Sequence, residues 1–324
     1  MLAREHFDAL PSLEAIRCAA REVHAVMAPT PQLRWPLLDA ALGCEVWVKH
    51  ENHTPVGAFK IRGGIVYFNR LREAGNVRGV IAATRGNHGQ SIAFAGARGN
   101  VAVTIVVPYG NSREKNEAMR ALGADLVEYG HDFAEAFGFA SDQAAQRGLH
   151  FVPSYAPELV RGVATYALEF FEGVPLLDTV YAPLGLGSGL SGLIAVRNGL
   201  ELATEVVAVV AAGAPAYALS LQARRLIEAP AETIADGIAC RQPNADALAL
   251  FLAQRIRCVT VTEAQIQDAM RRFFSCTHNV AEPAAAAALA AALNDRAPQR
   301  RRIGVVLSGA NVDRDVFARV LAAA

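Results

Sequence analysis

Residues 55–64 read PVGAFKIRGG, with one lysine, Lys60, between an aromatic residue and the start of a segment with helical periodicity. Its immediate neighbours are Phe59 and Ile61, whereas solvated lysines usually have polar neighbours. Desolvation in such a setting lowers the pKa of a lysine because it disfavours the ammonium form. The neutral amine is a nucleophile that can form a Schiff base with a carbonyl group. We therefore predict that Lys60 is the covalent anchor of an aldehyde cofactor.

On both sides of this stretch, short β-branched runs alternate with longer helical segments. Strands are predicted at 45–49, 79–84, 101–107, 125–129, 150–152, 179–184, 206–210, 258–262 and 303–307. Helices are predicted at 90–97, 113–122, 133–146, 158–171, 190–198, 263–274 and 282–293. This alternation is typical of α/β proteins with parallel sheets. Nine strands are many for one sheet, so we expect two domains, each with a twisted, mostly parallel sheet flanked by helices.

The domain boundaries follow from the same pattern. We expect a small domain at 78–155, inserted into a large cofactor-binding domain made of 1–77 and 156–324. A chain of 324 residues is about two domains long, and its hydrophobic content of 52% is enough for a sizeable core.

The composition excludes several classes of protein. Basic and acidic residues balance at 31 each, so no basic face indicates a nucleic-acid partner. Residues 1–25 mix charged with apolar residues, unlike a signal peptide. The most apolar run, 206–221, is broken by Gly213 and Pro215 and predicts a buried strand and a helix start, not a membrane span. We expect a cytoplasmic protein with five reduced, buried cysteines, namely Cys18, Cys44, Cys240, Cys258 and Cys276.

A second motif, TRGNHGQ at 84–90, follows a predicted strand and opens a helix. Free N–H groups at a helix start bind anions such as carboxylates, and glycines allow close backbone approach. The motif predicts a substrate site formed by Thr84, Arg85, Gly86, Asn87 and His88. An ordinary capped loop would explain the same residues if the motif stood alone.

A third motif, PLGLGSGLSG at 183–192, also lies between a strand and a helix. Alternating glycines before a helix start make a phosphate cradle. A dinucleotide fingerprint needs glycine where Leu190 stands, and no Gly-Lys-Ser/Thr follows, so a small monophosphate fits better than a nucleotide. A tight turn without a ligand is the alternative. The predicted cradle consists of Gly185, Leu186, Gly187, Ser188 and Gly189.

A fourth motif, LSGANVD at 307–313, places Ser308 where a strand ends. Taken alone, Ser308 is most simply a helix cap. Taken together, an anchoring lysine, a phosphate cradle and a carboxylate-binding helix start are what a pyridoxal phosphate enzyme acting on amino acids needs.

With these motifs in this order, from about residue 30 to Val312, the chain resembles the serine/threonine dehydratase family of fold-type II pyridoxal phosphate enzymes, which also includes serine racemases. The resemblance implies a dehydratase (ammonia-lyase) that converts β-hydroxy amino acids into 2-oxo acids and ammonia, and a homodimer. It implies that Lys60 forms the Schiff base with the cofactor, Phe59 packs beside the ring, Asn87 bonds the pyridine hydroxyl, residues 185–189 hold the phosphate, and Ser308 partners the pyridine nitrogen. The stretch 233–237 and the pair Glu282-Pro283 also recur in the family near the cofactor.

The chain departs from the family pattern at Arg85, where a small residue is usual and a serine serves the racemases as acid–base group. Arginine stays protonated, so racemisation is disfavoured. Three interpretations stay open for Arg85: it binds a second carboxylate, as in 3-hydroxyaspartate, it stacks on an aryl group, as in phenylserine, or it points to solvent. His88 beside it is a candidate general base, although a structural role at the turn is the simpler interpretation.

Two further departures concern metal and regulation. The metal-activated relatives have carboxylates where this chain has the carboxylate-free stretch 209–217, so we predict no metal there. Only 313–324 follow the Ser308 motif, so we expect no isoleucine-sensing regulatory domain. Two other functions remain possible on this fold: a β-replacement synthase of the cysteine synthase type, and a non-catalytic amino-acid sensor.

Overall fold

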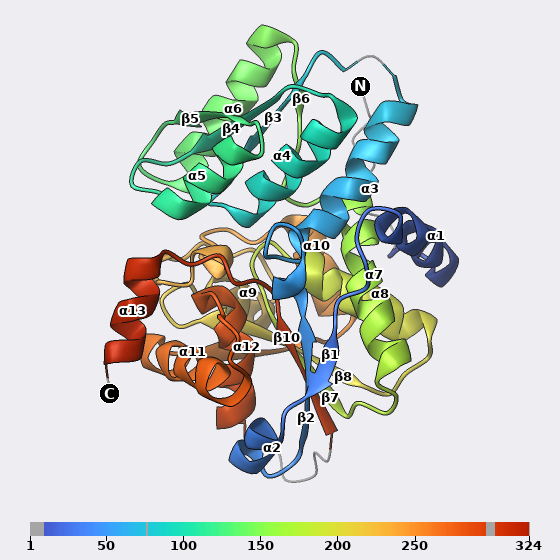
Figure 1. The fold of residues 1–324 in the computed structure, drawn as a ribbon, viewed down its shortest axis with the longest axis vertical. Coiled ribbons are helices and arrows are strands. Elements are labelled where there is room, and N and C mark those ends of the chain that lie inside the picture. The colour runs from blue at the N-terminus through green and yellow to red at the C-terminus, as the bar shows by residue number, and fades with distance from the viewer. Residues whose placement is uncertain (1–9, 76, 296–301, 324) are drawn as a thin grey trace.

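The computed structural model describes residues 10–75, 77–295 and 302–323, and our expectation of no signal peptide lies partly outside them, at 1–9. Two sheets organise the chain (Figure 1). The larger one has the strand order β1-β2-β10-β7-β8-β9 and is parallel except for β1, which pairs antiparallel with β2. Its strands are β1 (Gln32–Arg34), β2 (Glu45–His50), β7 (Thr179–Pro183), β8 (Glu205–Ala211), β9 (Arg257–Val261) and β10 (Arg302–Leu307).

The smaller sheet has the order β5-β4-β3-β6 and is wholly parallel. Its strands are β3 (Val80–Ala83), β4 (Val103–Val107), β5 (Asp125–Glu128) and β6 (His150–Phe151). The predicted fold class, two mostly parallel sheets flanked by helices, is confirmed, and all nine predicted strands are present. The short β1 was not predicted, and the division into domains at 78 and 155 stays a prediction.

Helices cover both sheets, and α3 lies between the two sheet units (Figure 1). The helices are α1 (Leu13–His24), α2 (Pro36–Leu42), α3 (Lys60–Glu73), α4 (Asn87–Gly99), α5 (Arg113–Ala121), α6 (Phe133–Arg147), α7 (Pro157–Gly173), α8 (Ser188–Gly199), α9 (Ala216–Ala223), α10 (Ala245–Ala253), α11 (Glu263–Thr277), α12 (Pro283–Asn294) and α13 (Arg314–Ala322). Two short 3₁₀ turns, η1 (Glu51–His53) and η2 (Asp236–Ile238), lie in the connections. We missed α1, α2 and α10, whereas α9 begins inside the run 206–221, where a helix start was predicted.

Alternation along β8 shows how the larger sheet is buried on both faces. Val206, Ala208 and Val210 belong to the core cluster that includes α7 and α8, whereas Val207 and Val209 belong to the one that includes α11 and α12. The alanine-rich α12 is buried along its length, from Ala284 to Ala292. Alanine side chains are small, so α12 can approach the sheet closely, and the helix predicted at 282–293 is confirmed.

No helix in the described part of the chain combines the length and apolarity that crossing a bilayer would require. Cys18, Cys240, Cys258 and Cys276 form no disulfide in the described part of the chain. Our expectation that all five cysteines are buried was wrong for four of them, since Cys240 is buried and the other four are partly exposed.

Candidate active site

Lys60 is the first residue of α3 and points from it to the start of α8. Its Nζ donates a hydrogen bond of 2.8 Å to Ser188 Oγ and lies 5.1 Å from the centroid of the Phe59 ring. Burial lowers the pKa of Lys60 from 10.5 to about 8. The sequence prediction of a lysine with a depressed pKa beside Phe59 therefore agrees with the geometry.

The chain before Lys60 runs alongside the end of β10. The Phe59 N–H donates to the Ser308 carbonyl oxygen at 3.0 Å, and the Ala310 N–H donates to the Gly57 oxygen at 2.9 Å. Ser308 is buried, with 4% of its surface exposed. The structure thus brings the first and fourth sequence motifs together, although about 250 residues separate them.

Residues 185–189 form a close-fitting turn between β7 and α8. Gly187 has φ of 112°, a conformation that favours glycine. A Cβ on Gly185 would lie 2.4 Å from the Gly237 carbonyl oxygen, and one on Gly189 would lie 3.4 Å from the Phe59 ring. The Leu186 carbonyl accepts a hydrogen bond of 3.1 Å from the Tyr217 hydroxyl, and this bond ties the turn to α9.

The first turn of α8 presents unpaired N–H groups. Those of Ser188, Gly189 and Leu190 donate to no other described residue, as expected for the first turn of a helix. Such N–H groups, together with the helix dipole, bind anions. The turn and the helix start thus have the groups that the predicted anion cradle needs, and Lys60 Nζ lies at their edge on Ser188.

The motif at 84–90 is shaped from within by Thr84. Its hydroxyl oxygen accepts from the N–H groups of Gly86 at 2.9 Å and Gly89 at 3.3 Å. The N–H groups of Asn87 and His88, at the start of α4, have no such partner within the described chain. They are the groups of this motif that remain available to an anion.

Asn87 is held by two side chains from distant segments. Its Nδ2 donates to Glu282 Oε1 at 2.7 Å, and its Oδ1 accepts from Asn311 Nδ2 at 2.9 Å. The same Asn311 nitrogen donates to the Val56 carbonyl oxygen at 2.9 Å. Asn87 is thereby tied both to the loop before Lys60 and to the segment after Ser308.

The other residues of this motif differ in exposure. His88 is buried, and burial, with a further effect of Lys60, lowers its pKa to about 3, so the imidazole is neutral. Arg85 is partly exposed and forms no hydrogen bond or ion pair with any described residue. No hydrogen bond joins Thr84, Arg85 or Gly86 to Lys60 in the described structure.

Sequence reasoning missed a charged group behind Asn87. Lys115 of α5 is buried, and its Nζ lies 2.6 Å from Asp236 Oδ2 and 3.7 Å from Glu282 Oε2. Burial raises the pKa of Glu282 to about 7, Asp236 adds to this, and Lys115 opposes it. The sequence signals were that 233–237 and Glu282 stand in family motifs near the cofactor and that Asn311 stands in the fourth motif, without a predicted role. Lys115 carried no signal.

Sequence reasoning also missed a cluster of buried ion pairs beside α3. Arg62 is fully buried, with its guanidinium 2.7 Å from Glu51 and 2.6 Å from Glu169. Lys49 lies 2.6 Å from Glu169 in the same cluster. Because Arg62 is two residues beyond Lys60, this cluster fixes the helix start that carries the lysine.

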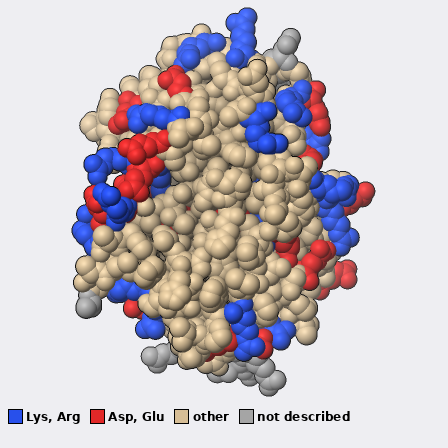
Figure 2. Space-filling view, viewed as in Figure 1, with Lys and Arg blue, Asp and Glu red and all other residues tan. Residues whose placement is uncertain are grey.

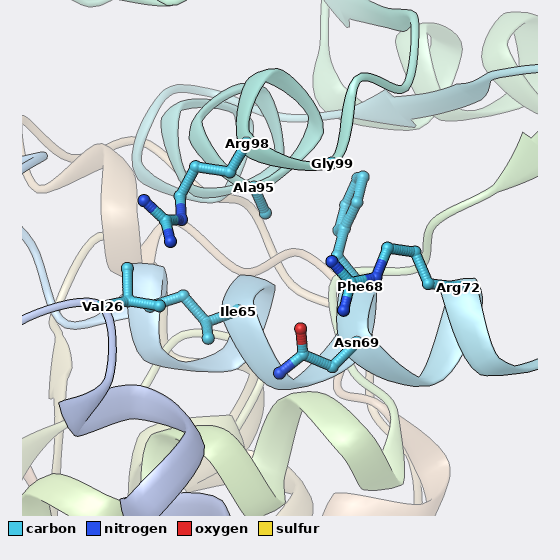
Figure 3. A pocket seen from close by; sticks show the side chains of 8 residues that line it. All are labelled: Val26, Ile65, Phe68, Asn69, Arg72, Ala95, Arg98 and Gly99. Carbon is cyan, nitrogen blue, oxygen red and sulfur yellow. The ribbon is translucent and has the colours of Figure 1, made fainter.

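Two hollows lie near α4. One, of about 70 Å³, lies between α3 and α4 (Figure 3). It contains none of the predicted site residues and is lined by Val26, Ile65, Phe68, Asn69, Arg72, Ala95, Arg98 and Gly99. The other, of about 200 Å³, borders the candidate site at Asn311, Lys115 and Gln90.

Among the described residues, no group of three or more His, Cys, Asp or Glu side chains is arranged to hold a metal ion. The predicted absence of a metal near 209–217 stays a prediction.

Two mostly parallel sheets, a lysine at a helix start and unpaired N–H groups beside it are the features expected of an α/β enzyme that holds an anionic carbonyl cofactor. The chain belongs to the pyridoxal-phosphate dependent enzyme family, whose pattern matches residues 23–309. It is 31% identical to L-threonine ammonia-lyase of Thermotoga maritima over 96% of this chain and 78% of that one. It is also 31% identical to L-threo-3-hydroxyaspartate ammonia-lyase of a Pseudomonas species, over 96% of this chain and 99% of that one. The structure of maize serine racemase is similar, with a TM-score of 0.90, 25% identity and coverage of 97% and 98%.

The described residues fit pyridoxal 5'-phosphate, the cofactor of this family. An amine with a lowered pKa suits an aldehyde, and the unpaired N–H groups of α8 suit a phosphate. The glycines at 185 and 189 leave the backbone accessible where a side chain would collide with Gly237 or contact Phe59.

Proposed function

We propose that this protein is a dehydratase (ammonia-lyase) of β-hydroxy amino acids of the threonine and serine type, releasing a 2-oxo acid and ammonia by α,β-elimination. The observation that carries the proposal is the position of Lys60 Nζ, 2.8 Å from Ser188 Oγ at the anion cradle. When bound, pyridoxal phosphate supplies an electron-accepting ring that acidifies the substrate's α-hydrogen. Lys60 would anchor it, residues 185–189 would hold its phosphate, and Phe59, Asn87 and Ser308 would surround its ring.

Lys60 also acts as the general base. A lysine with a pKa near 8 is partly neutral at physiological pH, so its Nζ can take the α-proton once the substrate amine has replaced it. Ser188 Oγ accepts a hydrogen bond from Nζ and keeps the amine at the edge of the cradle.

Ser308 determines which reaction follows. An aspartate opposite the ring nitrogen would keep that nitrogen protonated and stabilise a long-lived carbanion. The neutral hydroxyl of Ser308 supplies no such charge, so loss of the β-hydroxyl as the proton departs is favoured over transamination.

The start of α4 binds the substrate carboxylate. The N–H groups of Asn87 and His88 are unpaired in the described structure and lie at the positive end of the helix dipole. Thr84 and Gly86 shape the turn that presents these groups.

Arg85 favours a second candidate substrate, 3-hydroxyaspartate. Its guanidinium has no described partner and adjoins the proposed carboxylate site, so it is available for bidentate contact with a second carboxylate. The relative that acts on L-threo-3-hydroxyaspartate, by its name, supports this choice as much as the threonine enzyme supports the first. Stacking on an aryl group would instead favour phenylserine.

The experiment is release of oxo acid from a panel of threonine, serine, 3-hydroxyaspartate and phenylserine isomers, with Lys60→Ala as the blank. We expect turnover of at least one β-hydroxy amino acid and none by Lys60→Ala. Arg85→Ala should lower kcat/KM for 3-hydroxyaspartate at least tenfold more than for threonine if Arg85 binds the second carboxylate. Activity that survives in Lys60→Ala would overturn the proposal.

Three other activities are separated by their products. A β-replacement synthase would form cysteine from sulfide and an activated serine, a racemase would invert serine without releasing ammonia, and a sensor would bind amino acids unchanged. Arg85, which stays protonated, argues against a racemase because it cannot exchange a proton with the substrate.

We propose that the enzyme works in the cytoplasm as a homodimer. On the face shown in Figure 2, lysine, arginine, aspartate and glutamate gather along the margins and leave the middle nearly free of charge. A face depleted of charge at its centre is typical of an interface core. Sedimentation equilibrium should give a mass of about twice 34.4 kDa, and a monomer at micromolar concentration would contradict the homodimer.

A further inference from the structure

The orientation of the Asn87 amide is determined by its neighbours. The Val56 carbonyl can only accept, so the nitrogen of Asn311 must face it. That nitrogen also donates to Asn87, so Asn87 must present its oxygen to Asn311 and its nitrogen to Glu282. One N–H of the Asn87 amide bonds Glu282, and the second is left for another acceptor.

Glu282 is built into the junction where this bond is made. It is 1% exposed, and its backbone N–H donates to the Gly309 oxygen at 3.1 Å. A Cβ on Gly309 would lie 2.7 Å from Glu282 Oε1, so glycine leaves space for the carboxyl group. Glu282 Oε2 is buried, has no hydrogen-bond partner in the described chain, and lies 3.7 Å from Lys115 Nζ.

Two oxygens allow Glu282 to keep its bond to Asn87 whether or not it carries a proton. A proton on Oε2 leaves Oε1 free to accept from Asn87, and an ionised carboxylate accepts equally well. Lys115, which pairs with Asp236 at 2.6 Å, lies 3.7 Å from Oε2, the oxygen that does not bond Asn87. The orienting bond is therefore independent of pH near neutrality.

We propose that Glu282 is a positioning residue that keeps the Asn87 amide turned with its second N–H toward the ring oxygen of pyridoxal phosphate. This inference rests on the proposed function. Without Glu282, the bond from Asn311 is the remaining side-chain restraint on the Asn87 amide among the described residues, so the amide can tilt its second N–H away from the ring oxygen. A hydrogen bond that stabilises the ring oxygen anion is then lost, and the anion forms at higher pH.

The test compares Glu282→Ala with Glu172→Gln, a control at a half-exposed ion pair with Arg17. We expect Glu282→Ala to weaken pyridoxal phosphate binding to the apoprotein by roughly tenfold. We expect its visible absorbance band to titrate at a pH about one unit higher and kcat to fall with KM little changed. Glu282→Gln, which retains an acceptor oxygen, should restore most of the binding.

A double-mutant cycle tests whether Glu282 acts through Asn87. In an Asn87→Ala background, Glu282→Ala should have no further effect on cofactor affinity, whereas additive losses would overturn the inference. An unchanged affinity and absorbance titration in Glu282→Ala would overturn it too. If Glu282→Ala does not fold, Glu282→Asp serves, because its carboxyl is one methylene too short for the 2.7 Å contact. Wild-type protein that binds no pyridoxal phosphate would refute the proposed function itself.

Discussion

Two properties of Lys60 matter for cofactor capture: its place at the cradle and its lowered pKa. Its Nζ lies 5.1 Å from the centroid of the Phe59 ring, and burial lowers its pKa from 10.5 to about 8. Because the pKa is lowered, half of the Lys60 amine is neutral near pH 8, whereas an unperturbed lysine reaches that point near pH 10.5.

We predict that the apoprotein captures pyridoxal phosphate at a rate that rises with pH and levels off above about pH 8. Stopped-flow absorbance at a series of pH values gives the midpoint. A rate that is still rising at pH 10 would mean that the amine is solvated and that Lys60 is not desolvated at the cradle.

The glycines of the cradle make a second prediction at this scale. Gly185→Ala places a Cβ 2.4 Å from a backbone oxygen, which cannot move out of the way cheaply, so the turn must shift. We expect at least tenfold weaker cofactor binding and about 1–3 kcal/mol lower stability.

Gly138→Ala is the matched control, because Gly138 lies inside α6 with nothing within 4 Å of the added Cβ. This control should leave cofactor binding unchanged and raise stability by about 0.5–1 kcal/mol. Equal cofactor affinity in the two variants would contradict the cradle assigned to 185–189.

At the scale of the element, buried ion pairs of Arg62 hold the start of α3. Arg62 spans Glu51 of η1 and Glu169 of α7, and it also donates to the Thr165 hydroxyl at 3.0 Å. Burial alone would raise the pKa of Glu169, but Arg62 and Lys49 lower it to about 2, so this carboxylate stays ionised. Removing the arginine leaves two buried carboxylates short of their partner.

We predict that Arg62→Met lowers the free energy of unfolding by about 3–5 kcal/mol, measured by urea denaturation at pH 7. Arg17→Met removes a half-exposed partner of Glu172 and should cost less than about 1 kcal/mol. A loss in Arg62→Met no larger than in Arg17→Met would show that the cluster does not hold α3 in place.

The elements also show what sequence alone can predict. Strands such as β8, with four valines among residues 206–210, are rich in β-branched residues, and their position was predicted to within a residue or two. We missed α1 although Ile16, Ala19, Ala20 and Val23 give it a clear apolar face. Glycine motifs predicted the cradle because a local turn needs them, whereas Glu282, Lys115 and Arg62 matter through contacts between distant segments, which no local pattern encodes.

At the scale of the whole molecule, polar contacts connect the smaller sheet unit to the rest at the start of α5. The Ser112 hydroxyl, which caps α5, donates to Asp313 Oδ1, and the Glu114 N–H donates to the same oxygen at 3.3 Å. The Arg314 N–H returns a bond of 3.0 Å to Glu114 Oε1. Small polar interfaces between units allow relative motion more readily than apolar ones.

We predict that Asp313→Ala loosens this junction without disturbing either sheet. Losing the acceptor of two hydrogen bonds should speed amide hydrogen exchange at the start of α5 by roughly fivefold, with exchange in β7 and β8 unchanged. Asp315→Ala is the matched control, because Asp315 pairs only with arginines on the surface in the described structure, Arg113 and Arg314. If the two variants exchange alike at α5, Asp313 does not hold the smaller unit. If β7 and β8 also exchange faster, residues 78–155 do not behave as a separate domain.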